Sequence, residues 1–156
     1  MSQSSKLQQC QLEIVLLTAQ ANGFAKPVLR TESFIFKPAP AHGKNPNTVY
    51  VTGRTDHTYY GKIKNNWFWP SADYTTLPQH EQDSHRTEIL QTMQSPMQEA
   101  IKYGRQSGEC SICGRTLHNK ISIFNSIGPI CAEKMGWPLE SPPNPEEEDQ
   151  IDMTLL

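Results

Sequence analysis

Apolar residues recur along the chain with two different periods, and the change falls near residue 24. In residues 6–22 they return every three or four positions, which predicts a helix that ends before Gly23. The predicted apolar stripe consists of Leu7, Cys10, Ile14, Leu17 and Ala21. Free cysteine behaves as a small apolar side chain, so we expect Cys10 in the core and not at a metal.

Residues 24–74 carry short β-leaning pieces instead of helical periods. Glycine, proline and asparagine separate four segments rich in β-branched and aromatic side chains, ESFIFK, NTVYVT, HTYYGKIK and NWFWPS. The last two are joined by Asn65 and Asn66, a pair suited to a two-residue hairpin turn. The pattern predicts a small antiparallel sheet.

Helical patterns return after the sheet. Residues 71–83 are polar and are expected to form a loop, whereas residues 84–94 predict a helix. A further helix should begin at Pro96, with Ser95 as its N-cap and Gln98 completing a capping box, and should stop at Gly104. The predicted fold is therefore α+β, with residues 1–105 as the body and residues 106–138 as a separate cysteine-containing module.

Residues 139–156 form a proline-rich, acidic C-terminal tail that we expect to be disordered. Five of the 16 acidic residues lie in residues 141–156, so the rest of the chain carries 14 basic and 11 acidic side chains. A mildly basic body with an acidic tail is a distribution typical of proteins that handle nucleic acid.

Composition restricts the cellular setting. Apolar residues make up 36% of the chain, and no run of them is long enough to span a membrane. The first residues lack the basic-then-apolar pattern of a signal peptide, so a cytoplasmic protein is expected. In that compartment a C-x-x-C pair favours metal binding over a disulfide.

Cys110 and Cys113 form such a pair, and Gly114 after them permits a tight turn. Cys131 follows a Gly-Pro step that leads into a short helix, residues 129–135. A knuckle, a hairpin and a helix with a ligand in its first turn are the plan of a treble-clef zinc finger. We therefore expect one structural Zn²⁺ on these three cysteines.

A closed tetrahedral site needs a fourth ligand. His118, five residues after Cys113, is the nearest candidate, and Glu133 and His85 are the alternatives. With three protein ligands and a water the site would be catalytic, but no H-x-E pattern sits beside the cysteines to supply a general base.

The stretch from Tyr103 to Trp137 resembles a domain of unknown function common in bacteriophages and prophages, with the pattern YGRxTGxCxxCxRxL…S…GxGPxCAE. The matching residues are Tyr103, Gly104, Arg105, Gly108, Cys110, Cys113, Arg115, Leu117, Ser122, Gly128, Pro129, Cys131 and Glu133. Similarity in outline begins near residue 28. The chain departs from the pattern at His118-Asn119 and Ser126, and the first departure counts against His118 as a ligand. The resemblance implies a phage origin, and hence the cytoplasm of a bacterial host, and a three-cysteine zinc-finger-like module, without supplying an activity.

Rings and basic groups concentrate in the predicted sheet. Residues 24–74 hold ten of the 13 aromatic residues, and seven basic against three acidic side chains. This combination is typical of platforms for single-stranded nucleic acid. The candidate residues are Lys37, Lys44, Arg54, Tyr59, Tyr60, Lys62, Lys64, Trp67 and Trp69, extended from the module by Arg105, Arg115 and Lys120. Aromatic residues also fill the cores of small sheets, so this alternative stays open.

The chain ends in QIDMTLL, which resembles the hexapeptide by which bacterial replication and repair proteins dock on the sliding clamp. The docking candidates are Gln150, Ile151, Met153, Leu155 and Leu156. A host or phage DNA-processing protein, the clamp first, is the expected partner. A tail that shields the protein's own basic surface is the alternative.

No phosphate loop, carboxylate pair or nucleophile motif occurs at a known spacing. The sequence thus favours a non-enzymatic, zinc-binding phage accessory protein in DNA metabolism. A phage-encoded inhibitor of a host protein and a single-stranded DNA-binding protein with a self-shielding tail are the alternatives, and a nuclease-like enzyme with an open metal site is the weakest.

Overall fold

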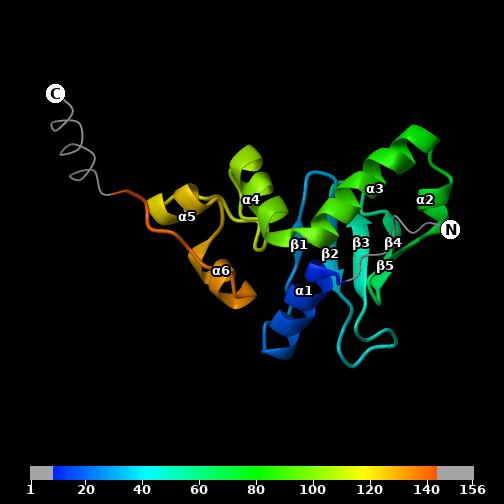
Figure 1. Cartoon of the computed structure of the whole chain (residues 1–156), viewed down its shortest axis with the longest axis horizontal. Coiled ribbons are helices and arrows are strands. Elements are labelled where there is room, and N and C mark those ends of the chain that lie inside the picture. Colours follow the sequence, from blue (N-terminus) through cyan, green and yellow to red (C-terminus); the bar gives the residue numbers. More distant parts are fainter. Residues whose placement is uncertain (1–8, 144–156) are drawn as a thin grey trace.

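A computed structural model describes residues 9–143, which fold into a sheet with helices on one face and a small helical module at one end (Figure 1). The strands are β1 (Leu29–Arg30), β2 (Phe34–Pro38), β3 (Val49–Gly53), β4 (Tyr59–Lys64) and β5 (Trp67–Pro70). The helices are α1 (Gln11–Ala21), α2 (Ala72–Thr75), α3 (Gln79–Gln94), α4 (Pro96–Ser107), α5 (Lys120–Asn125) and α6 (Pro129–Met135). The predicted α+β class with an antiparallel sheet is confirmed.

The sheet is a meander in which each strand pairs antiparallel with the next, in the order β1-β2-β3-β4-β5. All four predicted strand segments are present. The hairpin between β4 and β5 turns at Asn65 and Asn66, whose φ angles of 53° and 69° suit a type I′ turn. Lys64 consequently lies opposite Trp67. The two-residue strand β1 was not predicted.

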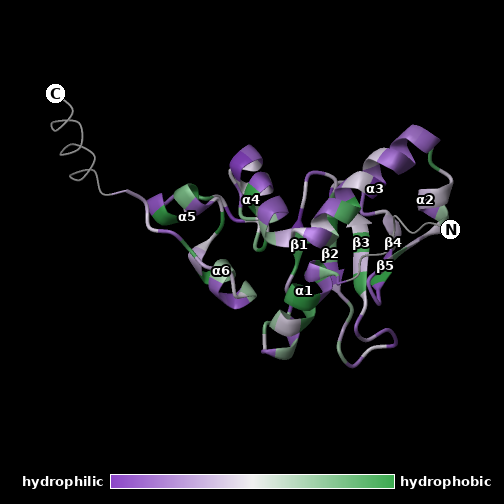
Figure 2. Cartoon of the chain, viewed as in Figure 1, coloured by the Kyte–Doolittle hydropathy of each residue, from purple (hydrophilic) through white to green (hydrophobic). Residues whose placement is uncertain are grey.

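One face of the sheet is buried and the other is open. Phe34 and Phe36 of β2, Val49 and Val51 of β3, Ile63 of β4 and Phe68 of β5 point into the core. Leu12 and Leu16 of α1 and Ile89 and Met93 of α3 belong to the same core cluster. Figure 1 shows α1 and α3 in front of the strands, and Figure 2 shows hydrophobic residues on α1 and the strands where they meet.

A β-bulge sorts two neighbouring tyrosines onto opposite faces. Val51 lies opposite Gly61, but Thr52 lies opposite Tyr59, so Tyr60 is an extra residue on β4. The bulge turns Tyr60 into the core, where it is 9% exposed and its hydroxyl donates to Asp56 at 2.9 Å. Tyr59 stays on the open face at 42% exposure. The expectation that Tyr60 offers an exposed ring is therefore wrong.

Helix α1 begins at Gln11 and buries a different stripe from the predicted one. Its buried residues are Leu12, Leu16 and Ala19, whereas Ile14 is 43% exposed. Cys10 precedes the helix as its N-cap and is fully buried, with its thiol donating to the Met93 carbonyl at 3.7 Å. Burial raises the pKa of Cys10 to about 12, so this thiol stays protonated. The core position expected for Cys10 is confirmed.

The polar segment after the sheet is largely helical, in contrast to the predicted loop. Ser71 caps α2, and Tyr74 within α2 is fully buried with its hydroxyl donating to the Gln82 carbonyl of α3. This one aromatic anchor secures the segment, and the first turn of α3 faces solvent with residues such as His80 and Asp83. A solvent-facing turn needs no apolar residue, so the sequence of this segment lacks the apolar periodicity that would have predicted a helix.

Helix α4 starts at Pro96 as predicted, but the capping box is absent. The N–H of Ser95 donates to the Gln91 carbonyl of α3 at 2.8 Å, and its side chain makes no cap bond. Ser95 thus joins two helices directly, with a ψ of 66° that is far from the extended value of most N-caps. The helix also continues past Gly104 and ends at Gly108, whose φ is 76°.

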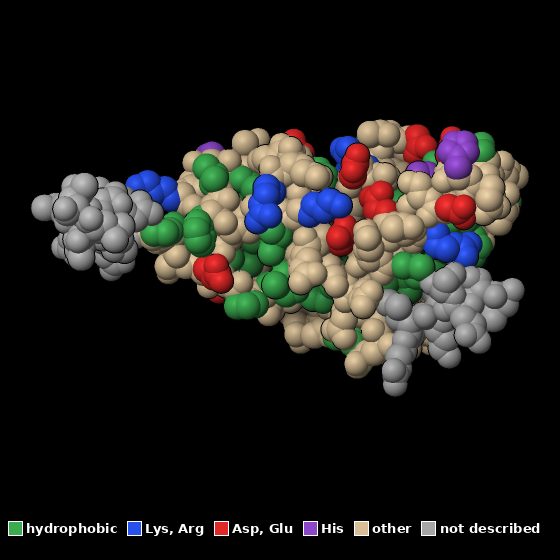
Figure 3. Space-filling model, turned by 45° about the horizontal axis from the view of Figure 1, so that its top comes forward, with side chains coloured by type: hydrophobic (Ala, Val, Ile, Leu, Met, Phe, Trp, Pro, Cys, Tyr) green, Lys and Arg blue, Asp and Glu red, His purple; other side chains and the backbone are tan. Residues whose placement is uncertain are grey.

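Within residues 9–143 no helix is long and apolar enough to cross a membrane. Large apolar side chains are nevertheless exposed on α5 and α6, and Figure 3 shows hydrophobic surface at that end of the molecule.

Candidate metal centre and nucleic-acid face

The knuckle that carries Cys110 and Cys113 is a tight hydrogen-bonded turn. The Gly114 N–H donates to the Cys110 carbonyl, and the Cys110 N–H donates to the Arg115 carbonyl, both at 2.8 Å. Gly114 has a φ of 77°, a left-handed conformation that glycine adopts without strain, as predicted for this position. The turn therefore holds both thiols on one side.

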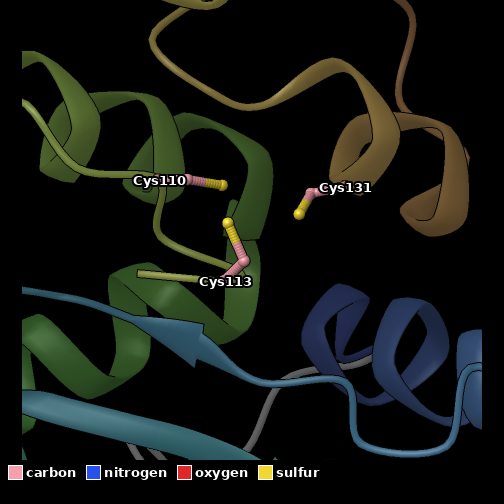
Figure 4. A group of neighbouring side chains, drawn as sticks. All are labelled: Cys110, Cys113 and Cys131. Carbon is pink, nitrogen blue, oxygen red and sulfur yellow. The ribbon is translucent and has the colours of Figure 1, made fainter. Parts of the chain in front are cut away.

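Cys131 reaches the knuckle from α6. Gly128 is the N-cap and Pro129 the first residue of this helix, and Gly136 ends it with a φ of 75°, so the predicted helix is confirmed. Figure 4 shows the sulfur of Cys131 pointing at those of Cys110 and Cys113. All three sulfurs lie within 4.8 Å of one another.

The three thiols differ in exposure and acidity. Cys110 is 1% exposed and Cys131 is 8% exposed, whereas Cys113 lies at the surface. The hydrogen bond from the Cys131 thiol, helped by backbone N–H groups, lowers the pKa of Cys110 to about 5. One of these N–H groups is that of Gly128, 3.4 Å from the Cys110 sulfur. The same pairing and burial raise the pKa of Cys131. The backbone N–H groups thus favour the charged form of Cys110.

This donor set fits a zinc ion. Thiolates that are 2.3 Å from one zinc at tetrahedral angles lie about 3.8 Å apart, which small side-chain rotations reach from the present arrangement. Backbone N–H groups that donate to a ligand sulfur orient it and stabilise its charge. The glycine at position 128 leaves room beside both buried sulfurs, since a Cβ there would be 3.7 Å from that of Cys110 and 3.9 Å from that of Cys131.

None of the predicted fourth ligands joins the three cysteines in the described part of the chain. Glu109 bridges to Thr116, and the Leu117 N–H donates to the Gly108 carbonyl at 2.8 Å. His118 follows this pairing and is exposed. His85 packs instead on Phe34, with ring centroids 5.0 Å apart. Glu133 lines a surface groove on α6. Within the described residues the three thiols are the group that could hold a metal, and a fourth ligand from His118, Glu133 or His85 stays a prediction.

The module is fastened to the sheet through β1. The Ser111 hydroxyl donates to the Arg30 carbonyl at 2.7 Å, and the Arg30 guanidinium donates to the Ile112 carbonyl at 2.9 Å. Ile112, Cys110 and Cys131 belong to the hydrophobic core that the sheet and α1 share. The metal centre is thus continuous with the body, and no sequence signal in β1 marked Arg30 for this role.

The open face of the sheet gathers half of the twelve candidate nucleic-acid contacts. Lys37 lies opposite Tyr50, Tyr50 opposite Lys62, and Lys62 opposite Trp69. Tyr59 stands beside Tyr50 with ring centroids 6.1 Å apart, and Trp67 beside Trp69 at 6.2 Å. Together with Lys64 these side chains make up what we call the outward face: Lys37, Tyr50, Tyr59, Lys62, Lys64, Trp67 and Trp69. Tyr50 was not among the predicted nucleic-acid contacts, although the alternation in Val49-Tyr50-Val51 puts its side chain on the other face of the sheet from the two buried valines.

The remaining basic candidates lie elsewhere. Lys44 is exposed in the loop between β2 and β3. The Arg54 guanidinium donates to the Glu32 carbonyl at 2.8 Å and lies 5.7 Å from the Tyr103 ring centroid, so it ties β3 to α4. Arg105, Arg115 and Lys120 are exposed on α4, the knuckle and α5.

The tail candidates Gln150, Ile151, Met153, Leu155 and Leu156 lie outside the described residues, as does the predicted disorder beyond residue 143.

Comparison with known proteins yields one match. A family model described as a family of unknown function (DUF6011) matches residues 100–136, which contain the second half of α4, the knuckle, α5 and α6. No curated protein and no solved structure matches the chain. The match coincides with the metal centre and leaves the sheet uncovered.

Proposed function

We propose that this protein binds single-stranded nucleic acid on the outward face, as a non-enzymatic, zinc-stabilised accessory protein in DNA metabolism. The observation that carries the proposal is the row Lys37–Tyr50–Lys62–Trp69, in which cation and ring alternate across four neighbouring strands. Strands lie about 4.8 Å apart, so the row is roughly 14 Å long.

The chemistry of this row favours a single strand over a duplex. Trp69 is 50% exposed and Tyr59 is 42% exposed, so their ring faces are open to a ligand. Bases of a single strand are free to stack on such rings, whereas the bases of a duplex are stacked on one another. Lysine ammonium groups beside the rings attract the phosphates. The strands contribute three lysines and no acidic residue to the outward face.

The zinc in this proposal is structural, in a treble-clef-like finger. Bound zinc would supply folding free energy to a small module whose apolar core is limited. Cys110, Cys113 and Cys131 would hold the zinc ion. The hydrogen bonds between Arg30 and the knuckle would then connect the rigid, metal-bound knuckle to β1 at the edge of the sheet.

Trp69→Ala should weaken binding to an oligothymidylate by about 1–3 kcal/mol, because one base loses its stacking partner. Fluorescence anisotropy at low salt measures the affinity, and thermal unfolding shows that the fold is kept. Phe124→Ala is the matched control, since Phe124 is a ring of similar exposure (44%) on α5. Equal affinity of the two variants, or no binding by the unaltered protein, would reject the outward face as the site.

A second part of the proposal concerns the C-terminal residues and rests on their sequence. QIDMTLL would dock a DNA-processing protein of the bacterial host or of the phage, with the sliding clamp as first candidate. Titration of purified clamp with a peptide of residues 144–156 should give a micromolar dissociation constant, as expected of a short motif that must order on binding. Gln150→Ala with Leu155→Ala should remove the binding. Absence of binding at hundreds of micromolar would leave an inhibitor of another host protein as the alternative.

A further inference from the structure

The surface of α5 and α6 exposes large apolar side chains that belong neither to the three-cysteine site nor to the outward face. Eight large apolar side chains of the described residues are exposed, and five of them lie between positions 121 and 139: Ile121, Ile123, Phe124, Ile130 and Leu139. Ile130 is the most exposed of all, at 70%. Exposed apolar clusters of this kind mark interaction sites.

A groove runs through this surface. Pro129, Ile130, Glu133, Trp137 and Leu139 line it, and its volume is about 380 Å³. We call it the finger groove. Figure 3 shows hydrophobic side chains on the surface at the end of the molecule that carries α5 and α6.

The chain leaves the finger beside this groove. Trp137 and Leu139 are themselves part of its lining. The next residue, Glu140, is held on α5 by Asn125, whose side-chain amide donates to the Glu140 carbonyl and accepts from its N–H, both at 2.9 Å. Whatever follows residue 140 therefore starts from a fixed point next to the groove.

We infer that the finger groove binds residues 150–156 of the same chain. Ten residues lead from Glu140 to Gln150, a span of up to about 33 Å that is ample for a return to the groove. Tethering of this length provides a millimolar effective concentration, so even weak docking becomes populated. The segment offers apolar side chains at alternate positions, Ile151, Met153 and Leu155.

Charge complements this apolar match. Residues 110–132 contain Arg115 and Lys120 but no acidic residue. The residues just before the docking segment, 146–149, are four consecutive acids. Glu133 in the groove and Glu140 beside it would repel this acidic run, so we expect the run towards Lys120 on α5 and the apolar end at Ile130.

Amide spectra of the full-length, zinc-loaded, ¹⁵N-labelled protein test the inference, without nucleic acid. Ile151→Asp with Leu155→Asp should shift the resonances of residues 121–139, because the groove loses its occupant. Ile130→Asp should reciprocally shift those of residues 150–156. Asp152→Ser with Thr154→Ser, which changes the intervening positions of the same segment, is the matched control and should leave the groove resonances in place.

Unchanged groove resonances in the Ile151→Asp, Leu155→Asp protein would overturn the inference and leave the groove to an external partner. Shifts that fade on twentyfold dilution would overturn it as well, since the occupant would then be a second copy of the chain. Because neither Ile130 nor the C-terminal segment belongs to the outward face, these outcomes are independent of nucleic-acid binding.

Discussion

Cys110→Ser should strip the protein of zinc and unfold the module around α5 and α6. Cys110 is 1% exposed, accepts the Gly128 N–H, and belongs to the core cluster together with Cys131. Structural zinc contributes on the order of 10 kcal/mol to the fingers that depend on it. Zinc content by elemental analysis and thermal unfolding by circular dichroism measure the two effects.

Cys10→Ser is the matched control for this substitution. It makes the same exchange of sulfur for oxygen at a fully buried cysteine, but Cys10 lies outside the group of three thiols. The control protein should keep one zinc per chain and lose only about 1–3 kcal/mol, the cost typical of altering one buried polar contact. Retention of stoichiometric zinc by Cys110→Ser, or its absence from the unaltered protein, would contradict the zinc site.

Local signals in the sequence were sufficient for four of the five strands and for the group of three cysteines. The hairpin at Asn65 and Asn66 follows from a backbone conformation that asparagine tolerates, and the knuckle follows from the spacing of Cys110 and Cys113. Each of these depends on residues a few positions apart. The position of Cys131 in the first turn of a helix could also be predicted, because Gly128 and Pro129 are typical of a helix start.

Features that depend on distant packing were missed. Whether Tyr59 or Tyr60 faces solvent is decided by the bulge opposite Thr52, which a single strand's alternation does not reveal. The buried stripe of α1 is Leu12, Leu16 and Ala19. The helix packs against β2, α3 and α6, and these contacts determine which of its faces is buried. His118 stands at a plausible ligand spacing, yet it is not part of the group of three thiols in the described residues, and spacing alone did not reveal this.

Gly104 is the most instructive of these cases, because its role was misjudged. It predicts a helix stop, but α4 passes through it and ends at Gly108. A Cβ at position 104 would lie 1.9 Å from the Ser126 carbonyl oxygen and 2.8 Å from its carbon. The glycine is therefore present so that the turn between α5 and α6 can approach the backbone of α4.

Gly104→Ala should destabilise the protein by about 3 kcal/mol, the upper end of the cost of overpacking. In an unobstructed helix interior the same exchange would gain about 1 kcal/mol, so the contact decides the sign. The obstacle is backbone, and Ser126 itself has a left-handed φ of 59°, so neither side yields without moving the turn. Chemical denaturation with circular dichroism measures the change in the free energy of unfolding.

The displaced turn should also loosen the metal centre. Ser126 is two residues before Gly128, whose N–H is directed at the Cys110 sulfur, so a shift of the turn moves a partner of the thiolate. Competition with a chelator should show faster zinc loss from Gly104→Ala. Gly108→Ala is the control, because a Cβ there meets nothing within 4 Å and its φ of 76° adds only about 1 kcal/mol of strain. If Gly104→Ala proves as stable as the unaltered protein, α4 and the finger do not pack through this contact.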